Sequence, residues 1–596
     1  MKKWLMILMA ALLMTSGCSM TQSQPETGSM KAGTYTATAD GYGGKVSVSV
    51  TVDSEKIVSV EVGDNTETPG VGGMVIEQLP GQIVETQSIA LDGIAGATFT
   101  SDAILTAVKD CLQQAGADLT QFEKETAAKS GEEIQLQKDV VIVGAGAAGL
   151  SAALRLQESG QDNILVLEKM AYTGGASATC GGGFLAAGSR YQQQAGIEDT
   201  PELMMEELLE KGHHINDVEL TRLHAENAAP TVDWLIDDIG VQFNTPQPSE
   251  TTINRDFTAV GGGAGMMQTL AEAAQQRGIE IQLNTRATEL IVDNGAVRGV
   301  LAEDTDGNHY TIQAQAVLLA TGGYGNNSQL MDEADVGRVI YYGPISSNGE
   351  GMTMARDIGA KVTNLQYVGV KPNGLETGEG IGKYTQPANN AMWKASAGIL
   401  VNDAGQRLID ETSSEEELVS IYKQQNDWAM YTVMDQAAYD IFYSTAIEKH
   451  LFSEAEAQQW IDEKGTGTTV FVRGETLQEA AEQAGIDAGQ LAQTIENYNQ
   501  GVAKGEDEFG RQVVAAFDTD GPVYIVKQNL RFATTLGGLD INTHCQVLNE
   551  QDEAIAGLYA AGEVVGNVQG DASSAYLSWS ATSGKIAAES ISEQLQ

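Results

Sequence analysis

The run DVVIVGAGAAGL, which begins at Asp139, constrains the fold of this chain more than any other feature. An apolar strand is followed by Gly144, Gly146 and Gly149, then by an Ala- and Leu-rich helix and a second apolar stretch, NILVLEK. The first glycine allows a tight turn, the second lets the backbone approach a pyrophosphate, and the third lets the helix pack on the strand. Glu168 closes the second strand, where its carboxylate can accept hydrogen bonds from both ribose hydroxyls. The pattern predicts a βαβ unit that binds a dinucleotide.

Composition and charge exclude several classes of partner. The 596 residues include 34 Lys and Arg against 81 Asp and Glu, a formal net charge of −47. A chain this acidic repels phosphate backbones, so we expect no nucleic-acid partner. The six histidines form no HExxH motif and the cysteines no CxxC motif, so we also expect no metal site.

The N-terminal sequence indicates that the protein is exported. Lys2 and Lys3 precede an apolar run over residues 4–14, and small residues then lead to Cys18. Residues 1–18 are a predicted secretory signal that resembles a bacterial lipoprotein signal, in which the cysteine is acylated. The alternative is an ordinary signal peptide with an incidental cysteine. We expect residues 19–32 to be a polar tether, and the chain to be lipid-anchored through Cys18 on the extracytoplasmic face of the cell membrane.

A small α+β domain is predicted over residues 33–116. Alternating valines over 46–52 and again over 58–62 are typical of a β-hairpin, and residues 101–114 show the apolar spacing of a helix. The charged stretch 117–138 is a predicted linker.

Further glycine-rich motifs follow the βαβ unit. They include TGGAS (173–177), ATGGYGNN (320–327), SSNGEGMTMARDIGA (346–360), GILVNDAGQRLIDE (398–411), TTLGGLDIN (534–542) and GLYAAGEVVG (557–566). In this order they resemble the fumarate reductase/succinate dehydrogenase flavoprotein superfamily. The resemblance implies an α/β fold: a Rossmann-like FAD domain in two pieces, 139–368 and 534–596, with an inserted α+β capping domain over 369–533.

The resemblance also implies a set of residues that bind FAD non-covalently. They are Gly144, Gly146, Ala148, Gly149, Glu168, Lys169, Gly174, Gly175, Ala176, Ser177, Gly182, Gly183, Ala287, Gly322, Gly323, Glu563, Leu577 and Ser578.

A second flavin is indicated by DGIAGAT, residues 92–98. The run resembles the flavinylation motif of FMN-binding domains, in which a flavin transferase links the FMN phosphate covalently to the final threonine, here Thr98. Small residues beside Thr98 leave room for a nucleotide, and a nearby helix N-terminus favours a phosphate. The alternative is that Thr98 only caps the helix that follows.

The catalytic residues of the superfamily are not all present. Its fumarate reductases hold a dicarboxylate with two arginines and two histidines, one arginine being the proton donor. Here the donor position is Glu415, the loop 569–585 has no arginine, and the histidine positions are Thr534 and Lys371. Without bidentate arginine clamps, fumarate is not the expected substrate. Glu415, if burial raises its pKa, Lys371 and Tyr576 are the candidate catalytic residues. The alternatives are that Glu415 belongs to a solvated acidic helix face with Glu416 and Glu417, and that Lys371 is a solvated surface lysine.

The sequence therefore predicts an extracytoplasmic flavin-dependent oxidoreductase acting on CH–CH groups. Electrons would pass from a membrane donor, by a quinol or extracellular flavin route, through FMN and FAD to an activated C=C bond of a urocanate- or enoate-like molecule. A ketosteroid-type FAD dehydrogenase and a non-catalytic electron-transfer flavolipoprotein are the alternatives.

Overall fold

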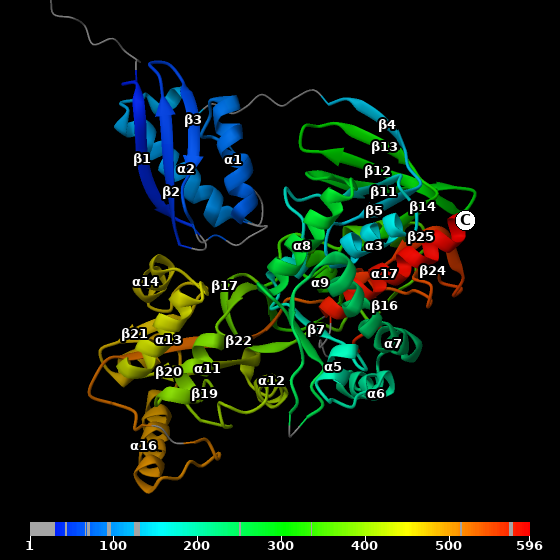
Figure 1. The fold of residues 1–596 in the computed structure, drawn as a ribbon. Helices are drawn as coiled ribbons and strands as arrows, with labels where there is room; N and C mark the ends of the chain where they lie inside the picture. The colour runs from blue at the N-terminus through cyan, green and yellow to red at the C-terminus, as the bar shows by residue number, and fades with distance from the viewer. Residues whose placement is uncertain are drawn as a thin grey trace, which may run out of the picture.

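The computed structural model describes residues 30–41, 44–65, 67, 72–91, 97–123, 131–249, 252–334, 336–512, 515–570 and 576–596. The predicted signal peptide, Cys18 and most of the tether lie outside these residues. Within the described part, no helix combines the length and apolar character needed to cross a bilayer. The chain forms three domains, which Figure 1 shows in blue (FMN domain), in cyan, green and red (FAD domain) and in yellow and orange (capping domain).

The FMN domain is a three-stranded antiparallel sheet covered by two helices. Its elements are β1 (Gly33–Asp40), β2 (Lys45–Val52), β3 (Ile57–Val62), α1 (Gly72–Thr86) and α2 (Thr98–Gln114). The predicted hairpin is confirmed as β2 and β3, whose valines at 46, 48, 50 and 52 are buried. The predicted helix is present but begins earlier, at Thr98, with Ala97 in the cap position.

A six-stranded sheet with the strand order β10-β6-β5-β14-β25-β24 forms the centre of the FAD domain. All neighbours are parallel except β24 and β25, and helix α3 (Ala147–Glu158) connects β5 to β6 as the glycine pattern predicts. The strands are β5 (Val140–Val143), β6 (Ile164–Leu167), β10 (Glu280–Gln282), β14 (Ala316–Leu319), β24 (Gln546–Leu548) and β25 (Ala554–Ala560).

Smaller sheets and the remaining helices surround this core. A four-stranded sheet joins β4 (Glu133–Gln137), β11 (Thr285–Asp293), β12 (Ala296–Asp304) and β13 (His309–Gln313). Two others pair β7 (Gly183–Leu185), β8 (Phe243–Asn244) and β9 (Asp256–Ala259), and β16 (Val362–Thr363) with β23 (Gly538–Leu539). The helices are α4 (Gly175–Thr179), α5 (Arg190–Gln194), α6 (Pro201–Lys211), α7 (Val218–Trp234), α8 (Gly262–Gln276), α9 (Ser328–Ala334), α10 (Glu350–Asp357) and α17 (Tyr576–Leu595).

The capping domain is built on a seven-stranded sheet whose longest strand is β22 (Val523–Phe532). The other strands are β15 (Val339–Tyr341), β17 (Lys371–Gly378), β18 (Ile381–Tyr384), β19 (Ile399–Val401), β20 (Ala429–Met434) and β21 (Phe471–Gly474). Its helices are α11 (Gln386–Ala395), α12 (Glu415–Lys423), α13 (Gln436–Glu448), α14 (Glu454–Glu463), α15 (Leu477–Ala484) and α16 (Ala488–Lys504).

Two segments differ from the predicted domain limits. β15 precedes the predicted start of the capping domain at 369, yet it pairs with β22 of the capping sheet. β4 lies in the predicted linker, yet it is paired in parallel with β13 of the FAD domain. Both strands are short and are stabilised by distant partners, so the local sequence does not reveal them.

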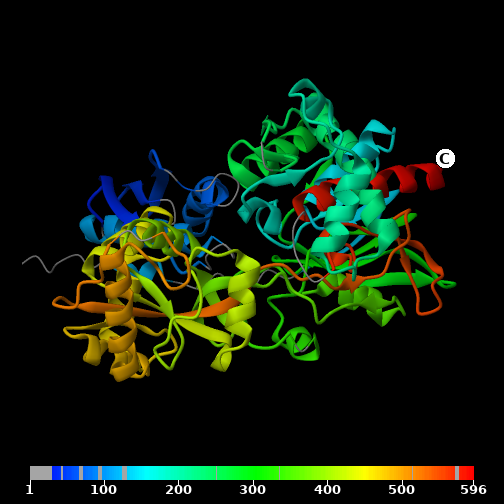
Figure 2. The ribbon, with the colours of Figure 1, turned by 90° about the horizontal axis from the view of Figure 1, so that it is seen from below.

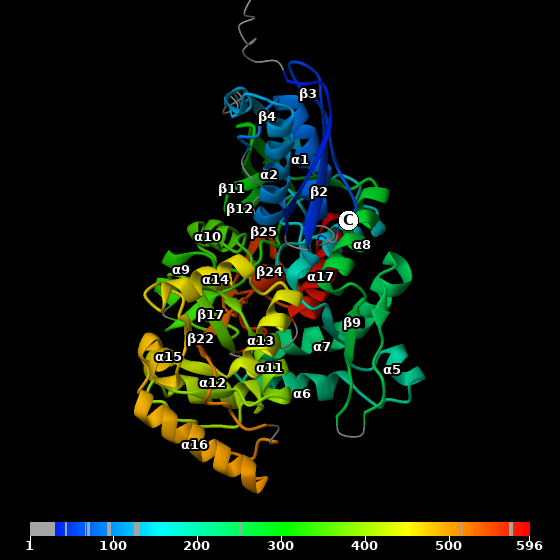
Figure 3. The same ribbon diagram turned by 90° about the vertical axis from the view of Figure 1, so that its left-hand side faces the viewer.

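The FMN domain packs against both other domains, as the views in Figures 2 and 3 show. Met170 and Tyr172 of the FAD domain are buried in the same apolar cluster as the core of the FMN domain. The side-chain amide of Gln78 donates to the Ala171 carbonyl at 3.2 Å. On the other side, Lys383 of the capping domain lies over the ring of Phe99, 5.6 Å from its centroid.

A buried arginine ties the capping domain together. Arg511, 3% exposed, donates from Nη1 to the Gly398 carbonyl at 2.7 Å and from Nη2 to the carbonyls of Trp393 (2.6 Å) and Ser396 (2.8 Å). It also lies 3.1 Å from the buried Glu411 carboxylate.

We expect Arg511→Gln to lower the free energy of unfolding by about 3–5 kcal/mol, because it removes the charge of a buried, hydrogen-bonded ion pair. Urea unfolding followed by tryptophan fluorescence, to which the buried Trp393 of this domain contributes, measures the loss. In the matched control Arg338→Gln, the lost ion pair with Asp427 is exposed, so the change should be only about 0–1 kcal/mol. Equal losses in the two variants would contradict this account.

Candidate active site

The glycine turn between β5 and α3 has the geometry that its sequence predicts. Gly144 has a φ of +107°, and a Cβ there would lie 2.3 Å from the Ala320 carbonyl oxygen. A Cβ on Gly149 would lie 1.9 Å from the Gly144 carbonyl oxygen, so this glycine lets α3 pack on the turn. At Gly146, leaving out its own helix and chain neighbours, the one atom of the described residues within 4 Å of such a Cβ is the Gly174 carbonyl oxygen, at 3.8 Å.

Glu168 lies at the end of β6, as expected, and its carboxylate accepts two backbone hydrogen bonds. They come from the N–H groups of Ala145 and Met170, each at 2.9 Å. Burial raises the pKa of Glu168, although both backbone bonds oppose the shift. Each carboxylate oxygen has a second lone pair, so the carboxylate can still accept hydrogen bonds from ribose hydroxyls.

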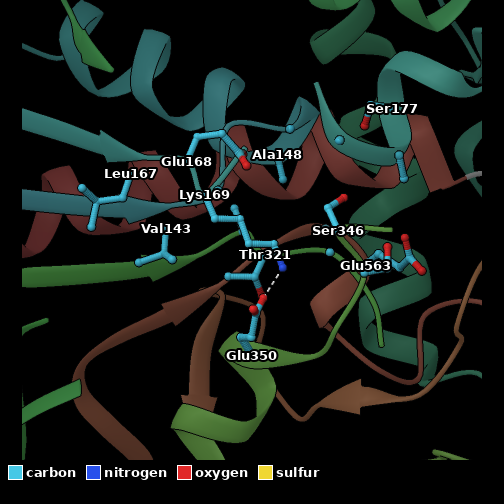
Figure 4. A pocket seen from close by; sticks show the side chains of 18 of the residues that line it. Val143, Ala148, Leu167, Glu168, Lys169, Ser177, Thr321, Ser346, Glu350 and Glu563 are labelled. Carbon is cyan, nitrogen blue, oxygen red and sulfur yellow. Dashed lines mark hydrogen bonds and ion pairs between the residues drawn. The ribbon is translucent and has the colours of Figure 1, made fainter. Parts of the chain in front are cut away.

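A cavity, here called the dinucleotide cavity, opens at this turn (Figure 4). Its wall brings together most of the residues predicted for FAD: Gly144, Gly146, Ala148, Glu168, Lys169, Gly174, Gly175, Ala176, Ser177, Ala287, Gly322 and Glu563. Sequence reasoning missed further lining residues, among them Thr285, Arg286, Thr321, Ser346, Ser347 and Glu350. Ser346, Ser347 and Glu350 belong to the motif SSNGEG, which was the available signal.

Six other residues predicted for FAD are not in the wall: Gly149, Gly182, Gly183, Gly323, Leu577 and Ser578. Gly323 has no room for a side chain, because a Cβ would lie 2.2 Å from Thr535 Oγ1. Ser578 is buried and donates to the Leu185 carbonyl at 2.7 Å, while its oxygen lies 2.8 Å from His224 Nε2. Its hydroxyl is therefore used inside the protein.

The residues present fit FAD. A Cβ added to Gly175 or Gly322 would meet no atom within 4 Å, so the backbone at both glycines faces open space in the wall of the cavity. Such bare backbone lets a pyrophosphate approach N–H groups closely. Lys169, which forms an ion pair with Glu350 in Figure 4, adds a cation to the same wall.

A second cavity, about 700 Å³ in volume, lies where the three domains meet, and we call it the interdomain cavity. The FMN domain contributes Gly41 and Phe99, and the FAD domain contributes Ala176 and residues of the segment 179–181. The capping domain supplies much of the rest, including Arg531. Ala176 lines both cavities, so the two adjoin.

Arg531, near the end of β22, is the most buried charge in this wall, at 2% exposed. Its Cζ lies 4.5 Å from the ring centroid of Tyr342 and 5.4 Å from that of Tyr384. Nη2 donates to Gln386 Oε1 at 2.6 Å, while Nε is buried without a hydrogen-bond partner. Burial lowers the pKa of Arg531, and the nearby Tyr342 and Glu415 oppose that shift.

The predicted catalytic pair Glu415 and Lys371 meets, but Glu415 differs from its predicted state. Lys371 Nζ lies 2.6 Å from Glu415 Oε2, and the side-chain amide of Gln386 donates to Glu415 Oε1. Burial alone would raise the pKa of Glu415, yet the hydrogen bond and charge of Lys371 outweigh it and lower the pKa. The prediction of a raised pKa was wrong, because the lysine on β17 supplies a counter-charge.

Neither of these two residues lines the interdomain cavity; Gln386 links Glu415 to Arg531, which does. Thr534, at the position of a superfamily histidine, lies in the cavity wall. Sequence reasoning missed Arg531, which belongs to no motif and follows the polar residues 527–529 in its strand.

The third predicted catalytic residue, Tyr576, lies apart from this pair. Its hydroxyl donates to the Thr535 carbonyl at 3.0 Å. Burial, with the nearby Glu563 and Tyr324, raises its pKa well above the ordinary value. Tyr576 therefore keeps its proton, and it lines neither cavity.

Residues 92–96 of the predicted flavinylation motif lie outside the described residues. Thr98 is the first residue of α2, and the next residue, Phe99, is half exposed and lines the interdomain cavity. The backbone that bears Thr98 therefore lies beside that cavity.

Comparisons with known proteins agree with this architecture. The model of the FAD binding domain family matches residues 139–574, and that of the FMN-binding domain matches residues 41–113. Urocanate reductase of Eggerthella lenta is 32% identical over 555 residues, covering 90% of this chain and 88% of that protein. A probable fumarate reductase of Shewanella frigidimarina is 31% identical over 472 residues, covering 76% and 74%. The open conformation of a flavocytochrome c3 fumarate reductase matches with a TM-score of 0.64 at 27% identity, covering 80% and 84%.

Gly146→Ala tests the dinucleotide cavity. Gly146 has φ −80° and ψ −171°, which any residue adopts, so the fold should tolerate the change. The added methyl group enters the space where a pyrophosphate would approach, and we expect FAD affinity to fall about tenfold or more. Titration of FAD into the deflavinated full chain measures the affinity. The control Gly81→Ala, on an exposed face of α1, should bind FAD normally, and unchanged affinity in Gly146→Ala would refute the assignment.

Proposed function

Because the chain belongs to the fumarate reductase/succinate dehydrogenase flavoprotein superfamily, we propose that it is an extracytoplasmic reductase of an activated C=C bond. It is a flavin-dependent oxidoreductase with an FAD domain and an FMN-binding domain. In the proposed reaction two electrons pass from a membrane donor, by way of FMN on Thr98 and FAD, to a urocanate- or enoate-like acceptor.

One observation carries the proposal: the interdomain cavity touches all three domains. It adjoins the dinucleotide cavity at Ala176, and its wall also includes Phe99, the residue after Thr98. An acceptor in this cavity would lie beside the FAD site, and the proposed FMN attachment point lies next to the same space. When bound, FAD supplies hydride transfer to one carbon of the double bond and FMN supplies electron transfer.

The second carbon needs a proton, and the chain holds one nearby. Lys371 Nζ lies 2.6 Å from Glu415 Oε2 and lowers the pKa of that carboxyl, and Gln386 connects this pair to Arg531 in the cavity wall. We assign Lys371 and Glu415 to proton supply, with Arg531 as the cation that faces the acceptor. Tyr576 remains a third candidate, held by its hydrogen bond to Thr535.

The N-terminal sequence supports the proposed location. Two lysines, an apolar run and Cys18 have the order of a lipoprotein signal, so a lipid anchor would hold the enzyme at the membrane beside its electron donor. The DGIAGAT motif supports a flavin transferase as the partner that attaches FMN.

The direct test is anaerobic oxidation of reduced methyl viologen by the fully flavinylated chain. The acceptors are fumarate, urocanate, cinnamate, acrylate and an enone steroid. We expect a monocarboxylate with an activated double bond to be reduced faster than fumarate, because both superfamily arginines are replaced or absent in the sequence. Rapid fumarate reduction would contradict this specificity. If no acceptor is reduced although both flavins can be reduced, the proposed function is contradicted. Fast turnover with oxidised dyes would instead indicate a dehydrogenase.

Thr98→Ala tests the proposed FMN attachment. The phosphoester needs a hydroxyl, so we expect the variant to lack covalently bound flavin on a denaturing gel while it retains FAD. Thr106→Ala, on an exposed turn of the same helix, is the matched control and should be flavinylated normally. Covalent flavin on the Thr98→Ala protein would end the assignment.

A further inference from the structure

Arg531 is a buried cation without a carboxylate partner. Among the described residues, no acidic group lies within salt-bridge distance of its guanidinium, although the side chain is almost fully removed from water. Its hydrogen-bond partners are the neutral side chains of Gln386 and Tyr342, and Nε is buried without a partner. Removing an unpaired charge from water is strongly unfavourable, so buried arginines are normally paired.

The acids nearest to Arg531 are already paired with other cations. Glu415 forms its ion pair with Lys371, at 2.6 Å. Glu456, the carboxylate in the described wall of the interdomain cavity, pairs with Lys383 at 2.6 Å. Subtracting these pairs leaves one positive charge at the cavity, on Arg531, in a chain whose net charge is −47. The cavity is therefore set up for one anionic group.

The aromatic side chains around Arg531 also favour a particular shape of ligand. Tyr342 and Tyr384 cover the guanidinium, and their ring centroids lie 5.6 Å apart with 41° between the planes. Phe99 and Phe452 add apolar aromatic surface to the same cavity. Aromatic walls favour a planar conjugated group, which can stack on a ring face.

We propose that Arg531 binds the single carboxylate of an aryl-acrylate substrate, whose aromatic group lies against Tyr384 and Tyr342. The inference rests on the proposed function and names the substrate class for the same site. Arg531 thus binds the carboxylate in place of the superfamily arginines, which this chain lacks. The cavity volume of about 700 Å³ accommodates a ring joined to an acrylate.

The test measures binding separately from turnover. Cinnamate is titrated calorimetrically into the oxidised, fully flavinylated chain, alongside cinnamamide, which has no charge, and crotonate, which has no ring. We expect cinnamate to bind more tightly than either, and Arg531→Gln to weaken cinnamate binding by about 10–100-fold, the value of a charge-assisted hydrogen bond. Cinnamamide binding should change little. Arg298→Gln, on the exposed face of β12, is the matched control and should bind cinnamate normally.

Tyr384→Ala provides a second variant in case Arg531→Gln does not fold. Tyr384 is 39% exposed, so the fold should tolerate its loss. We expect about a five- to tenfold loss of cinnamate affinity, the value of one aromatic contact, and no loss for crotonate. Equal losses for both ligands would overturn the role of the ring.

The outcomes separate the two proposals. Unchanged cinnamate affinity in Arg531→Gln, with a lowered flavin potential, would mean that the guanidinium neutralises a flavin and would overturn the inference. Reduction of acrylate without cinnamate binding would also overturn it while the proposed function stands. Tight, Arg531-dependent cinnamate binding without turnover of any acceptor would support the ligand class and refute the reductase function.

Discussion

The placement of the site depends on how β22 is attached to the FAD domain at Thr535, which is fully buried. Glu563 Oε1 accepts hydrogen bonds from the Thr535 backbone N–H at 2.9 Å and from its hydroxyl at 3.1 Å. The Thr535 carbonyl accepts from the Tyr576 hydroxyl. Glu563 lines the dinucleotide cavity, so one carboxylate joins the FAD site to the strand that bears Arg531.

Burial raises the pKa of Glu563 to about 7, and the bonds from Thr535 oppose that shift. The carboxylate therefore lies near the midpoint of its titration at neutral pH. Its charged form accepts the Thr535 hydrogen bonds more strongly than the neutral form. Even so, burial outweighs these bonds and the folded state favours the neutral form, so the stability that Glu563 contributes is lost as the pH rises from about 4.5 to about 7.

Features set by local chemistry could be predicted from the sequence, whereas those set by distant partners could not. The turn at Gly144 follows from residues within one βαβ unit, and the structure has it as predicted. Helix α1 escaped prediction because it begins with two glycines and because Pro80 and Gly81 interrupt its pattern; it is stabilised by burial of Val75, Leu79 and Ile83. Strand β1, GTYTATAD, escaped because few of its residues are apolar.

The same distinction applies to the site. Glu415 was expected to have a pKa raised by burial, but its counter-charge comes from Lys371, 44 residues away in the chain, and its sequence neighbours do not reveal that pairing. Arg531 belongs to no motif, and its importance comes from Tyr342 and Tyr384, which reach it from other parts of the chain. A site that binds its cofactor through backbone groups can therefore be predicted from glycine spacing. A substrate site made of side chains from distant parts of the chain cannot.

The charge pattern of the interdomain cavity connects the missing arginines to specificity. Arg531 can satisfy one carboxylate, but a second carboxylate on the same ligand would find Lys383 already paired with Glu456. A carboxylate removed from water without a partner loses several kcal/mol of hydration free energy, which the rest of a small ligand does not recover. Tyr342, Tyr384 and Phe99 instead offer apolar surface to the other end of the ligand. The arrangement that suits an aryl-acrylate thus disfavours a dicarboxylate on physical grounds, with no steric exclusion required.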